Sequence, residues 1–394
     1  MTEHRELERL RDMVFTCNRC GACREKYSAE MTHTPAFRVC PIREHDGGFE
    51  HQCARGRLTI AQGLLDGELD YSPELVDLIY TAPDCALCTW VCNELPQLDP
   101  PAVWRAMRRD IVAAGLGPPQ GLRQKDDFVR ERYNTFGARS ERAKWAQGLD
   151  LPREGELLFF AGCYASYTQP EIARATVAIL QHGGVTPAYL GELEWCCGVT
   201  QVHDGSVEIA EEMARHNLAA IESSGAKRVL TSCAECFKVL KIDYPDLVGE
   251  LPFEVLHVSE LLASMLREGL LVPSVDLAEK RVAFHDPCHL GRIGGVFDEP
   301  RALIEAIPGV ELVEMKRNRD FAWCCGYGAD LVSATRPELA SDIAKGRMEE
   351  AREAGAEALI TACPRCVRGL SRADRELPVY DLTVVIAQAL GASG

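Results

Sequence analysis

The sequence predicts an α/β protein in which a mainly helical amino-terminal unit precedes two copies of an α/β unit with parallel sheets. In the first part, apolar residues recur at helical spacing. In the remainder, short apolar runs alternate with amphipathic stretches, and their order is repeated once. A chain of 394 residues, 46% of them hydrophobic, is too long for one compact core and fits several domains.

We expect the helical unit to span residues 1–115. Its apolar residues fall into two stretches of helical spacing, Leu58, Ala61, Leu64 and Leu65, then Leu75, Leu78 and Ile79. The run Gly115-Leu116-Gly117-Pro118-Pro119 ends the preceding helix, and we interpret residues 116–152 as a connector. Basic and acidic residues are interleaved between Arg123 and Lys144, which predicts a solvated helix face.

The rest of the chain is a tandem repeat, with copies at residues 153–275 and 276–394. Each copy has a strand that ends in cysteine, a helix, a short strand, Trp-Cys-Cys-Gly, a second helix, a strand that enters Cys-x-x-Cys, and a closing run. The predicted strands are 157–163, 187–190 and 229–233, then 281–288, 310–313 and 359–363, and the closing runs are 255–260 and 379–383. In such sheets reactive groups collect at the carboxyl ends of the strands. The cysteines of each copy should therefore share one edge, and the two edges could face each other.

The bulk composition excludes some classes of partner. A net charge of −16 argues against binding to nucleic acid or an anionic lipid surface. No apolar run reaches the roughly 20 residues of a membrane helix, and the charged start of the chain does not resemble a signal peptide. We expect a cytoplasmic protein without direct membrane insertion, whose membrane association, if any, would run through a partner subunit.

Eight of the eighteen cysteines lie in the helical unit. Cys17-x-x-Cys20-x-x-Cys23 is typical of bacterial ferredoxins, in which the fourth cysteine, here Cys40-Pro41, binds the other cluster. The second motif is Cys85-x-x-Cys88-x-x-x-Cys92. Its first cysteine is missing, because Ala82 stands at that position, and Cys53 could replace it. The predicted ligands are Cys17, Cys20, Cys23 and Cys92 for one cubane [4Fe-4S] cluster and Cys40, Cys53, Cys85 and Cys88 for the other. The alternative is a three-iron second cluster with Cys53 free.

Each repeat supplies five cysteines, which are Cys163, Cys196, Cys197, Cys233 and Cys236, then Cys288, Cys324, Cys325, Cys363 and Cys366. Disulfides are rare in reducing compartments, and zinc takes four ligands, so neither accounts for five cysteines matched twice. We predict iron–sulfur sites, with Gly198 and Gly326 allowing close approach of the backbone beside them. The sequence by itself therefore indicates a redox protein.

The order Cys, Cys-Cys-Gly, Cys-x-x-Cys, occurring twice after a two-cluster ferredoxin-like unit, resembles the fused catalytic subunit of heterodisulfide reductase with its cysteine-rich CCG domains. It is also similar to the iron–sulfur subunits of glycolate oxidase and anaerobic glycerol-3-phosphate dehydrogenase. The opening Phe284-His285-Asp286-Pro287-Cys288-His289 is typical of this broad family. The resemblance implies that each complete five-cysteine set holds a noncubane [4Fe-4S] cluster and that the two clusters flank a substrate disulfide.

The predicted function is therefore an iron–sulfur oxidoreductase that passes electrons through two cubane clusters to two noncubane clusters, which reduce a small disulfide. Electrons would enter from a flavoprotein or membrane cytochrome subunit, because the chain has no Gly-x-Gly-x-x-Gly fingerprint for a flavin or nicotinamide. His203, His285 and His289 are candidates to deliver protons, although a surface or hydrogen-bonding role is the more common one. The alternatives are an electron-transfer subunit that relays electrons to a quinone, cytochrome or other acceptor, and a structural or redox-sensing protein.

Overall fold

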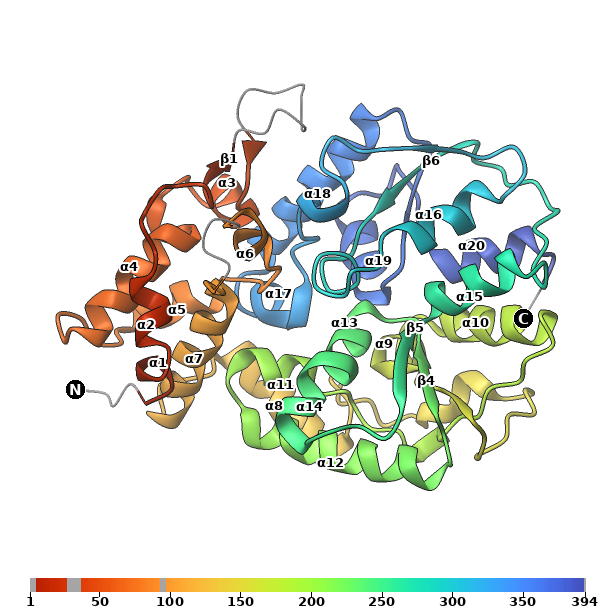
Figure 1. Ribbon diagram of the computed structural model, residues 1–394, viewed down its shortest axis with the longest axis horizontal. Helices are drawn as coiled ribbons and strands as arrows, with labels where there is room; N and C mark the ends of the chain where they lie inside the picture. The colour runs from red at the N-terminus through yellow and green to blue at the C-terminus, as the bar shows by residue number, and fades with distance from the viewer. Residues whose placement is uncertain (1–4, 27–36, 93–96, 393–394) are drawn as a thin grey trace.

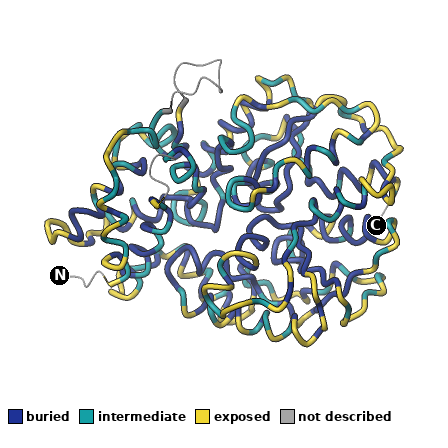
Figure 2. The backbone as a smooth tube through the Cα atoms, in the orientation of Figure 1, coloured by how far each residue is buried: buried dark blue, intermediate teal, exposed yellow. Residues whose placement is uncertain are grey.

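A computed structural model of the protein describes residues 5–26, 37–92 and 97–392. Figure 1 shows a helical amino-terminal lobe on one side of the molecule, with the first repeat below and the second repeat above on the other side. The backbone is buried along the seams where the lobes meet and exposed mainly at the outer loops (Figure 2). The three lobes therefore pack on one another along these seams.

The amino-terminal lobe is helical, as the apolar spacing predicts. The two predicted stretches lie in α4 and α5, and Ser72 caps α5 by accepting a hydrogen bond from the Leu75 backbone N–H at 3.2 Å. The strands β1 and β2 pair in a short antiparallel ribbon. The elements are α1 (Arg5–Glu8), α2 (Arg11–Phe15), β1 (Glu25–Lys26), β2 (Phe37–Arg38), α3 (Pro41–His45), α4 (Ala54–Leu65), α5 (Pro73–Tyr80), α6 (Leu87–Val91) and α7 (Pro100–Ala113).

Each repeat contains one parallel sheet, which confirms the predicted fold class. The first sheet has the order β3-β4-β5 and the second β7-β6-β8-β9. The strands are β3 (Leu157–Phe159), β4 (Arg228–Thr231), β5 (Glu254–His257), β6 (Arg281–His285), β7 (Glu311–Val313), β8 (Ala358–Thr361) and β9 (Val379–Asp381). The strand expected at 187–190 is reduced to a parallel bridge between Ala188 and Leu158. Pro187 lacks the N–H that a longer ladder would use.

Helices cover the sheets and join the two copies. The carboxyl-terminal helix α20 (Leu382–Ala389) packs against α10 of the first copy, where the Thr383 hydroxyl donates to the Ile172 carbonyl at 3.4 Å (Figure 1). The other helices of the repeats are α9 (Gly162–Tyr167), α10 (Pro170–His182), α11 (Val199–Asp204), α12 (Val207–Ser223), α13 (Ala234–Lys238), α14 (Tyr244–Val248), α15 (Val258–Arg267), α16 (Asp298–Glu305), α17 (Leu331–Thr335), α18 (Pro337–Glu353) and α19 (Pro364–Ala373).

The connector is an ordered part of the core. It forms α8 (Gln120–Arg132) and a short 3-10 helix, η2 (Arg142–Ala146). The predicted solvated face is only partly correct, since Asp126, Arg142 and Trp145 are buried. The reason is tertiary, because α8 contacts α11 of the first copy and α17 of the second. No helix in the described part of the chain is long and apolar enough to cross a membrane.

Candidate iron–sulfur sites

The eighteen cysteines all lie in described parts of the chain, and none of them forms a disulfide. The ten repeat cysteines are buried except Cys288, which is half-buried. In the amino-terminal lobe, Cys53 and Cys85 are buried, Cys20 is exposed and the other five are intermediate. Free thiols that converge at this density are the donor set that iron–sulfur clusters require, so the residues present fit such groups.

The amino-terminal lobe contains two small cavities lined by thiols. The first, of about 20 Å³, is lined by Cys17, Cys20, Cys23, Cys88 and Cys92. The second, of about 40 Å³, is lined by Cys40, Cys85 and Cys88. Cys88 thus lines both cavities, Cys53 lines neither, and the other cysteines separate into the two predicted sets.

Cys53 occupies a different position from the rest of its predicted set. Its thiol contacts Cys23, which lowers the pKa of Cys53 to about 6. The residues that line the second cavity include its neighbours Gln52 and Ala54. Cys53 is therefore placed between the two cavities, next to a ligand predicted for the other cluster.

The five cysteines of each repeat form a continuous series of thiol contacts. The series are Cys163–Cys196–Cys197–Cys236–Cys233 in the first copy and Cys288–Cys324–Cys325–Cys366–Cys363 in the second. The two series meet where Cys233 contacts Cys363. Because both residues follow the carboxyl ends of parallel strands, the structure brings the two groups face to face, as the repeat predicts.

The second copy borders the amino-terminal lobe. Cys85 is close enough to Cys324 and Cys288 for each charge to affect the other's pKa. Arg292, in the loop after Cys288, donates from Nε to the Cys85 carbonyl at 2.8 Å. The thiol groups therefore follow one another in space, from the Cys17 group through the Cys40 group and the second copy to the first copy.

Two of the repeat cysteines lie at helix amino-termini. Cys233 is the residue before α13 and Cys363 the residue before α19, so both thiols lie where helical N–H groups are free. The positive end of a helix dipole favours a thiolate. The Cys-x-x-Cys spacing thus coincides with a local structure that favours metal-binding thiolates.

Gly198 and Gly326 end the two Cys-Cys-Gly turns with φ values of 81° and 85°. A Cβ at Gly326 would lie 2.6 Å from the Ala340 carbonyl oxygen in α18, whereas one at Gly198 would have its nearest neighbour at 3.5 Å. The backbone at Gly326 therefore lies too close to α18 for a side chain to fit there. Gly162, which the cysteine motifs do not include, has a φ of 74°, and its Cβ would lie 2.9 Å from the Cys236 sulfur. Its position directly before Cys163 is the signal that could have identified it.

Charged side chains that the motifs do not indicate also surround the thiols. Arg142 of the connector donates to the Cys163 sulfur at 3.4 Å and forms an ion pair with buried Glu194 at 2.8 Å. Arg365 of the second copy lines a cavity of about 20 Å³ together with all five cysteines of the first copy. No local sequence pattern identifies such residues, because each reaches a cysteine of another segment.

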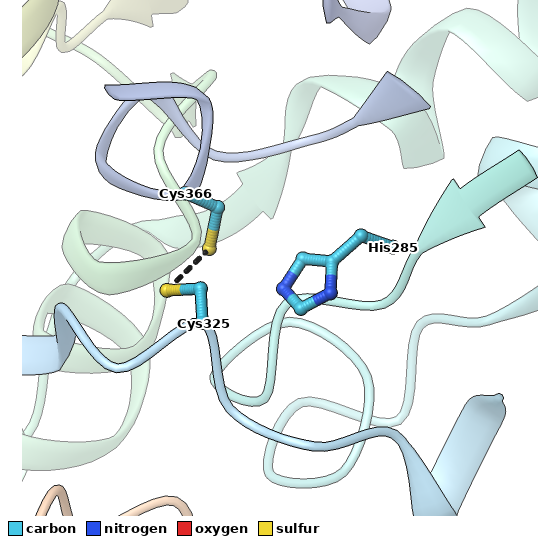
Figure 3. Close-up of side chains that lie close together, drawn as sticks. All are labelled: His285, Cys325 and Cys366. Atoms are coloured by element: carbon cyan, nitrogen blue, oxygen red, sulfur yellow. Dashed lines mark hydrogen bonds between the residues drawn. The ribbon is translucent and has the colours of Figure 1, made fainter. Parts of the chain in front are cut away.

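The three predicted histidines are fully or almost fully buried. His203 donates through Nδ1–H to the Asp84 carboxylate at 2.8 Å and stacks on His289, with ring centroids 5.5 Å apart. Burial lowers the pKa of His203 to about 4. His285 lies beside Cys325 and Cys366 (Figure 3). None of the three is a surface histidine.

Comparison with known proteins agrees with this geometry. A cysteine-rich domain family, CCG, matches residues 157–241 and 282–371. One subunit of the dihydromethanophenazine:CoB–CoM heterodisulfide reductase from Methanosarcina barkeri is 34% identical, over 96% of this chain and 94% of that protein. An EtfAB:quinone oxidoreductase from Syntrophomonas wolfei is 28% identical over 80% of this chain and 47% of its own. A hypothetical protein from Helicobacter pylori shares the fold, with a TM-score of 0.50 at 10% identity over 86% of this chain and 67% of its own.

The fold and the thiol groups define an iron–sulfur oxidoreductase with duplicated CCG domains. Its relatives include subunits of multisubunit redox complexes. Within this class, the chain belongs to the same family as the Methanosarcina heterodisulfide reductase subunits.

Proposed function

We propose that this protein is the subunit of a heterodisulfide reductase-type complex that reduces a small disulfide substrate. The observation that carries the proposal is the contact between Cys233 and Cys363, which joins two complete five-cysteine groups. A disulfide has two sulfurs and takes up two electrons, and this arrangement offers one metal site for each sulfur. The relatives named as heterodisulfide reductase subunits support the same reaction class.

The predicted clusters supply electrons and iron sites for sulfur. We propose two cubane [4Fe-4S] clusters, held by Cys17, Cys20, Cys23 and Cys92 and by Cys40, Cys53, Cys85 and Cys88, and one noncubane [4Fe-4S] cluster in each repeat. The position of Cys53 beside Cys23 means that it would have to turn toward the second cavity to complete its set. If it does not, the three-iron alternative follows.

The chain itself would position the substrate and deliver protons. Arg365 directs a guanidinium toward the cavity of the first copy, where it would stabilise negative charge on a released sulfur. His289 follows Cys288 directly, and neither of its buried ring nitrogens has a hydrogen-bond partner among the described residues. Both of its ring nitrogens are therefore free to exchange a proton, and we propose that it carries one to a leaving thiolate.

Electrons would enter at the amino-terminal lobe from a flavoprotein or a membrane cytochrome subunit. The order of the thiol groups supports this direction, because the Cys17 group lies at one end of the series and the first copy at the other. With a membrane cytochrome as this partner, we propose that the protein is cytoplasmic and associates with the membrane through that subunit.

The second candidate function is an electron-transfer subunit without its own substrate. The similarity to an EtfAB:quinone oxidoreductase favours it, since that relative is named for a quinone as acceptor. In this case the same four sites would relay electrons, and the cavity beside Arg365 would hold no disulfide.

Iron and sulfide analysis with EPR on the anaerobically purified protein tests the cluster content, followed by mixing the reduced protein with CoM–CoB heterodisulfide. We expect about sixteen irons per chain and an EPR signal of noncubane clusters from the repeats. Two thiols should be released per disulfide as the clusters are oxidised. Cys363→Ser should abolish this oxidation but keep the amino-terminal cubane signals. About four irons without a noncubane signal would refute the assignment, and full loading with oxidation by a quinone only would favour the relay.

A further inference from the structure

His285 is placed against the second five-cysteine group. It is the last residue of β6, it is fully buried, and one of its ring nitrogens lies within 4.8 Å of the sulfurs of Cys325 and Cys366. Figure 3 shows the ring edge remote from the main chain facing the two sulfurs. Its Nε2 atom has no hydrogen-bond partner among the described residues. A buried polar atom without a partner is costly, so this nitrogen is oriented for an interaction at the thiol site.

Arg347 determines which ring nitrogen carries the proton. Its Nε donates to Nδ1 of His285 at 3.4 Å. The guanidinium is itself fixed, because it also donates to the Arg317 carbonyl at 3.0 Å and forms an ion pair with Glu350. An arginine can only donate, so Nδ1 must be the acceptor. In a neutral imidazole the single proton then resides on Nε2, the nitrogen that faces the sulfurs.

We infer that His285 directs its Nε2–H at a sulfur atom of the cluster held at the second five-cysteine site, and that it raises the reduction potential of this cluster without ligating iron. An iron ligand would need a lone pair on Nε2, which the Arg347 contact assigns to Nδ1. Hydrogen bonds to cluster sulfurs favour the reduced, more negative form. The inference rests on the proposed clusters in the repeats.

The first copy has no histidine at the matching position, and the side-chain donor that the structure describes at its cysteines is Arg142, which donates to the Cys163 sulfur at 3.4 Å. His285 lies three residues before Cys288, and the residue three before Cys163 is Phe160, which is also fully buried. A phenylalanine ring offers no N–H to a sulfur. The two sites, although built from the same cysteine pattern, therefore differ in their side-chain donors, which are a guanidinium at Cys163 and an imidazole beside Cys325 and Cys366.

This inequivalence fits the spatial order of the thiol groups. The second copy lies next to Cys85 of the amino-terminal lobe, and the first copy is reached through it. With its potential raised by His285, the cluster held beside Cys85 would be the first of the two repeat clusters to accept an electron from the amino-terminal lobe. The two halves of a disulfide would thus meet sites of different reducing strength.

The test is an EPR-monitored redox titration of the anaerobically loaded full chain. His285→Phe reproduces the first copy, and we expect full iron content but a lower midpoint potential for one repeat cluster. The reduced-to-oxidised ratio at a fixed potential should fall about tenfold, which is 59 mV for a one-electron couple. His285→Gln retains an N–H donor and should lose less. Phe160→Leu, the matched control in the first copy, should leave that potential unchanged.

Each outcome decides the inference. Loss of about four irons in His285→Phe, or a strongly coupled imidazole nitrogen in pulsed EPR of the unchanged protein, would show that His285 is a ligand and would overturn it. Equal potentials in His285→Phe and the unchanged protein would also overturn it. If the unchanged protein itself lacks the repeat clusters, the proposed function fails; if it carries them and His285→Phe shows no shift, only this inference fails.

Discussion

A buried pair of carboxyl groups, Asp126 and Asp204, connects the connector with the first repeat. Asp126 accepts hydrogen bonds from Gln201 at 2.9 Å and from the Ser206 hydroxyl at 2.7 Å, while Asp204 accepts from the Ser206 backbone N–H at 2.9 Å. Burial raises the pKa of both carboxyl groups, and the negative charge of Asp126 raises that of Asp204 further. The folded chain therefore retains a proton that the unfolded chain releases.

Asp204→Asn should make folding less dependent on pH. Because the folded pKa is raised, the stabilising effect of this proton is complete below the unfolded pKa of about 3.9 and is lost as the pH rises through the folded pKa. Between pH 6 and pH 8 the unchanged protein should lose stability that the variant keeps, at up to about 1.4 kcal/mol per pH unit while the pH is below the folded pKa. Urea unfolding of the anaerobic, iron-loaded protein at the two pH values measures this.

Asp127→Asn is the control for this prediction, because Asp127 lies on the same helix as Asp126 but is exposed. Its stability should follow that of the unchanged protein at both pH values. A similar loss of stability with pH in Asp204→Asn and in the unchanged protein would contradict the assignment of the retained proton to this pair.

At the scale of elements, the two Cys-Cys-Gly turns share a sequence but not a packing partner. Both glycines have positive φ, a conformation that costs other residues roughly 1–2 kcal/mol. Only Gly326 also touches the backbone of a neighbouring helix, α18, at a distance where a Cβ would not fit. The two copies thus share the Cys-Cys-Gly motif, but the second copy has less room for a side chain at its glycine.

Gly326→Ala should therefore be more damaging than Gly198→Ala. We expect Gly198→Ala to lose about 1–2 kcal/mol, and Gly326→Ala to lose more, because the Ala340 carbonyl must also move. Thermal unfolding and iron content of the two variants, prepared side by side, measure the difference. Equal losses would show that close packing against α18 does not constrain the second turn.

For the whole molecule, one buried arginine links the two repeats. Arg365, between Cys363 and Cys366, forms ion pairs with Glu235 of the first copy at 2.5 Å and with Asp330 of its own copy at 2.7 Å. Glu235 in turn accepts a hydrogen bond from the Ala329 backbone N–H at 2.8 Å. The link passes directly beside the contact between Cys233 and Cys363.

Arg365→Met should disturb both repeats together. Removing the guanidinium leaves buried Glu235 without its counter-charge and Asp330 with Lys125 at 4.0 Å, and breaking such a buried pair typically costs about 3–5 kcal/mol. We expect a lower unfolding temperature and altered EPR signals from both repeat sites. Arg375→Met, which replaces an exposed arginine on the same copy, should change neither. An altered signal from one repeat alone would show that the bridge does not couple them.

Much of the fold could be predicted because its signals are local. The periodicity of apolar residues predicts α4 and α5, and the repeated strand-to-cysteine pattern predicts two parallel sheets with thiols at one edge. The length of the strand predicted at 187–190 was overestimated. An apolar run does not reveal how few ladder hydrogen bonds a segment beginning with Pro187 makes. The burial of the connector was underestimated, because its many charged residues predict a solvated face although one face is buried.

The sequence by itself determined which class of protein this is and predicted the cysteines as metal ligands, because cysteine spacing is a property of the chain. The tertiary structure alone decided the spatial order of the thiol groups, the roles of Arg142 and Arg365, and the placement of His285 opposite Cys325 and Cys366. These depend on contacts between segments far apart in the chain, where burial strengthens every charge and hydrogen bond. Local patterns carry no record of such contacts.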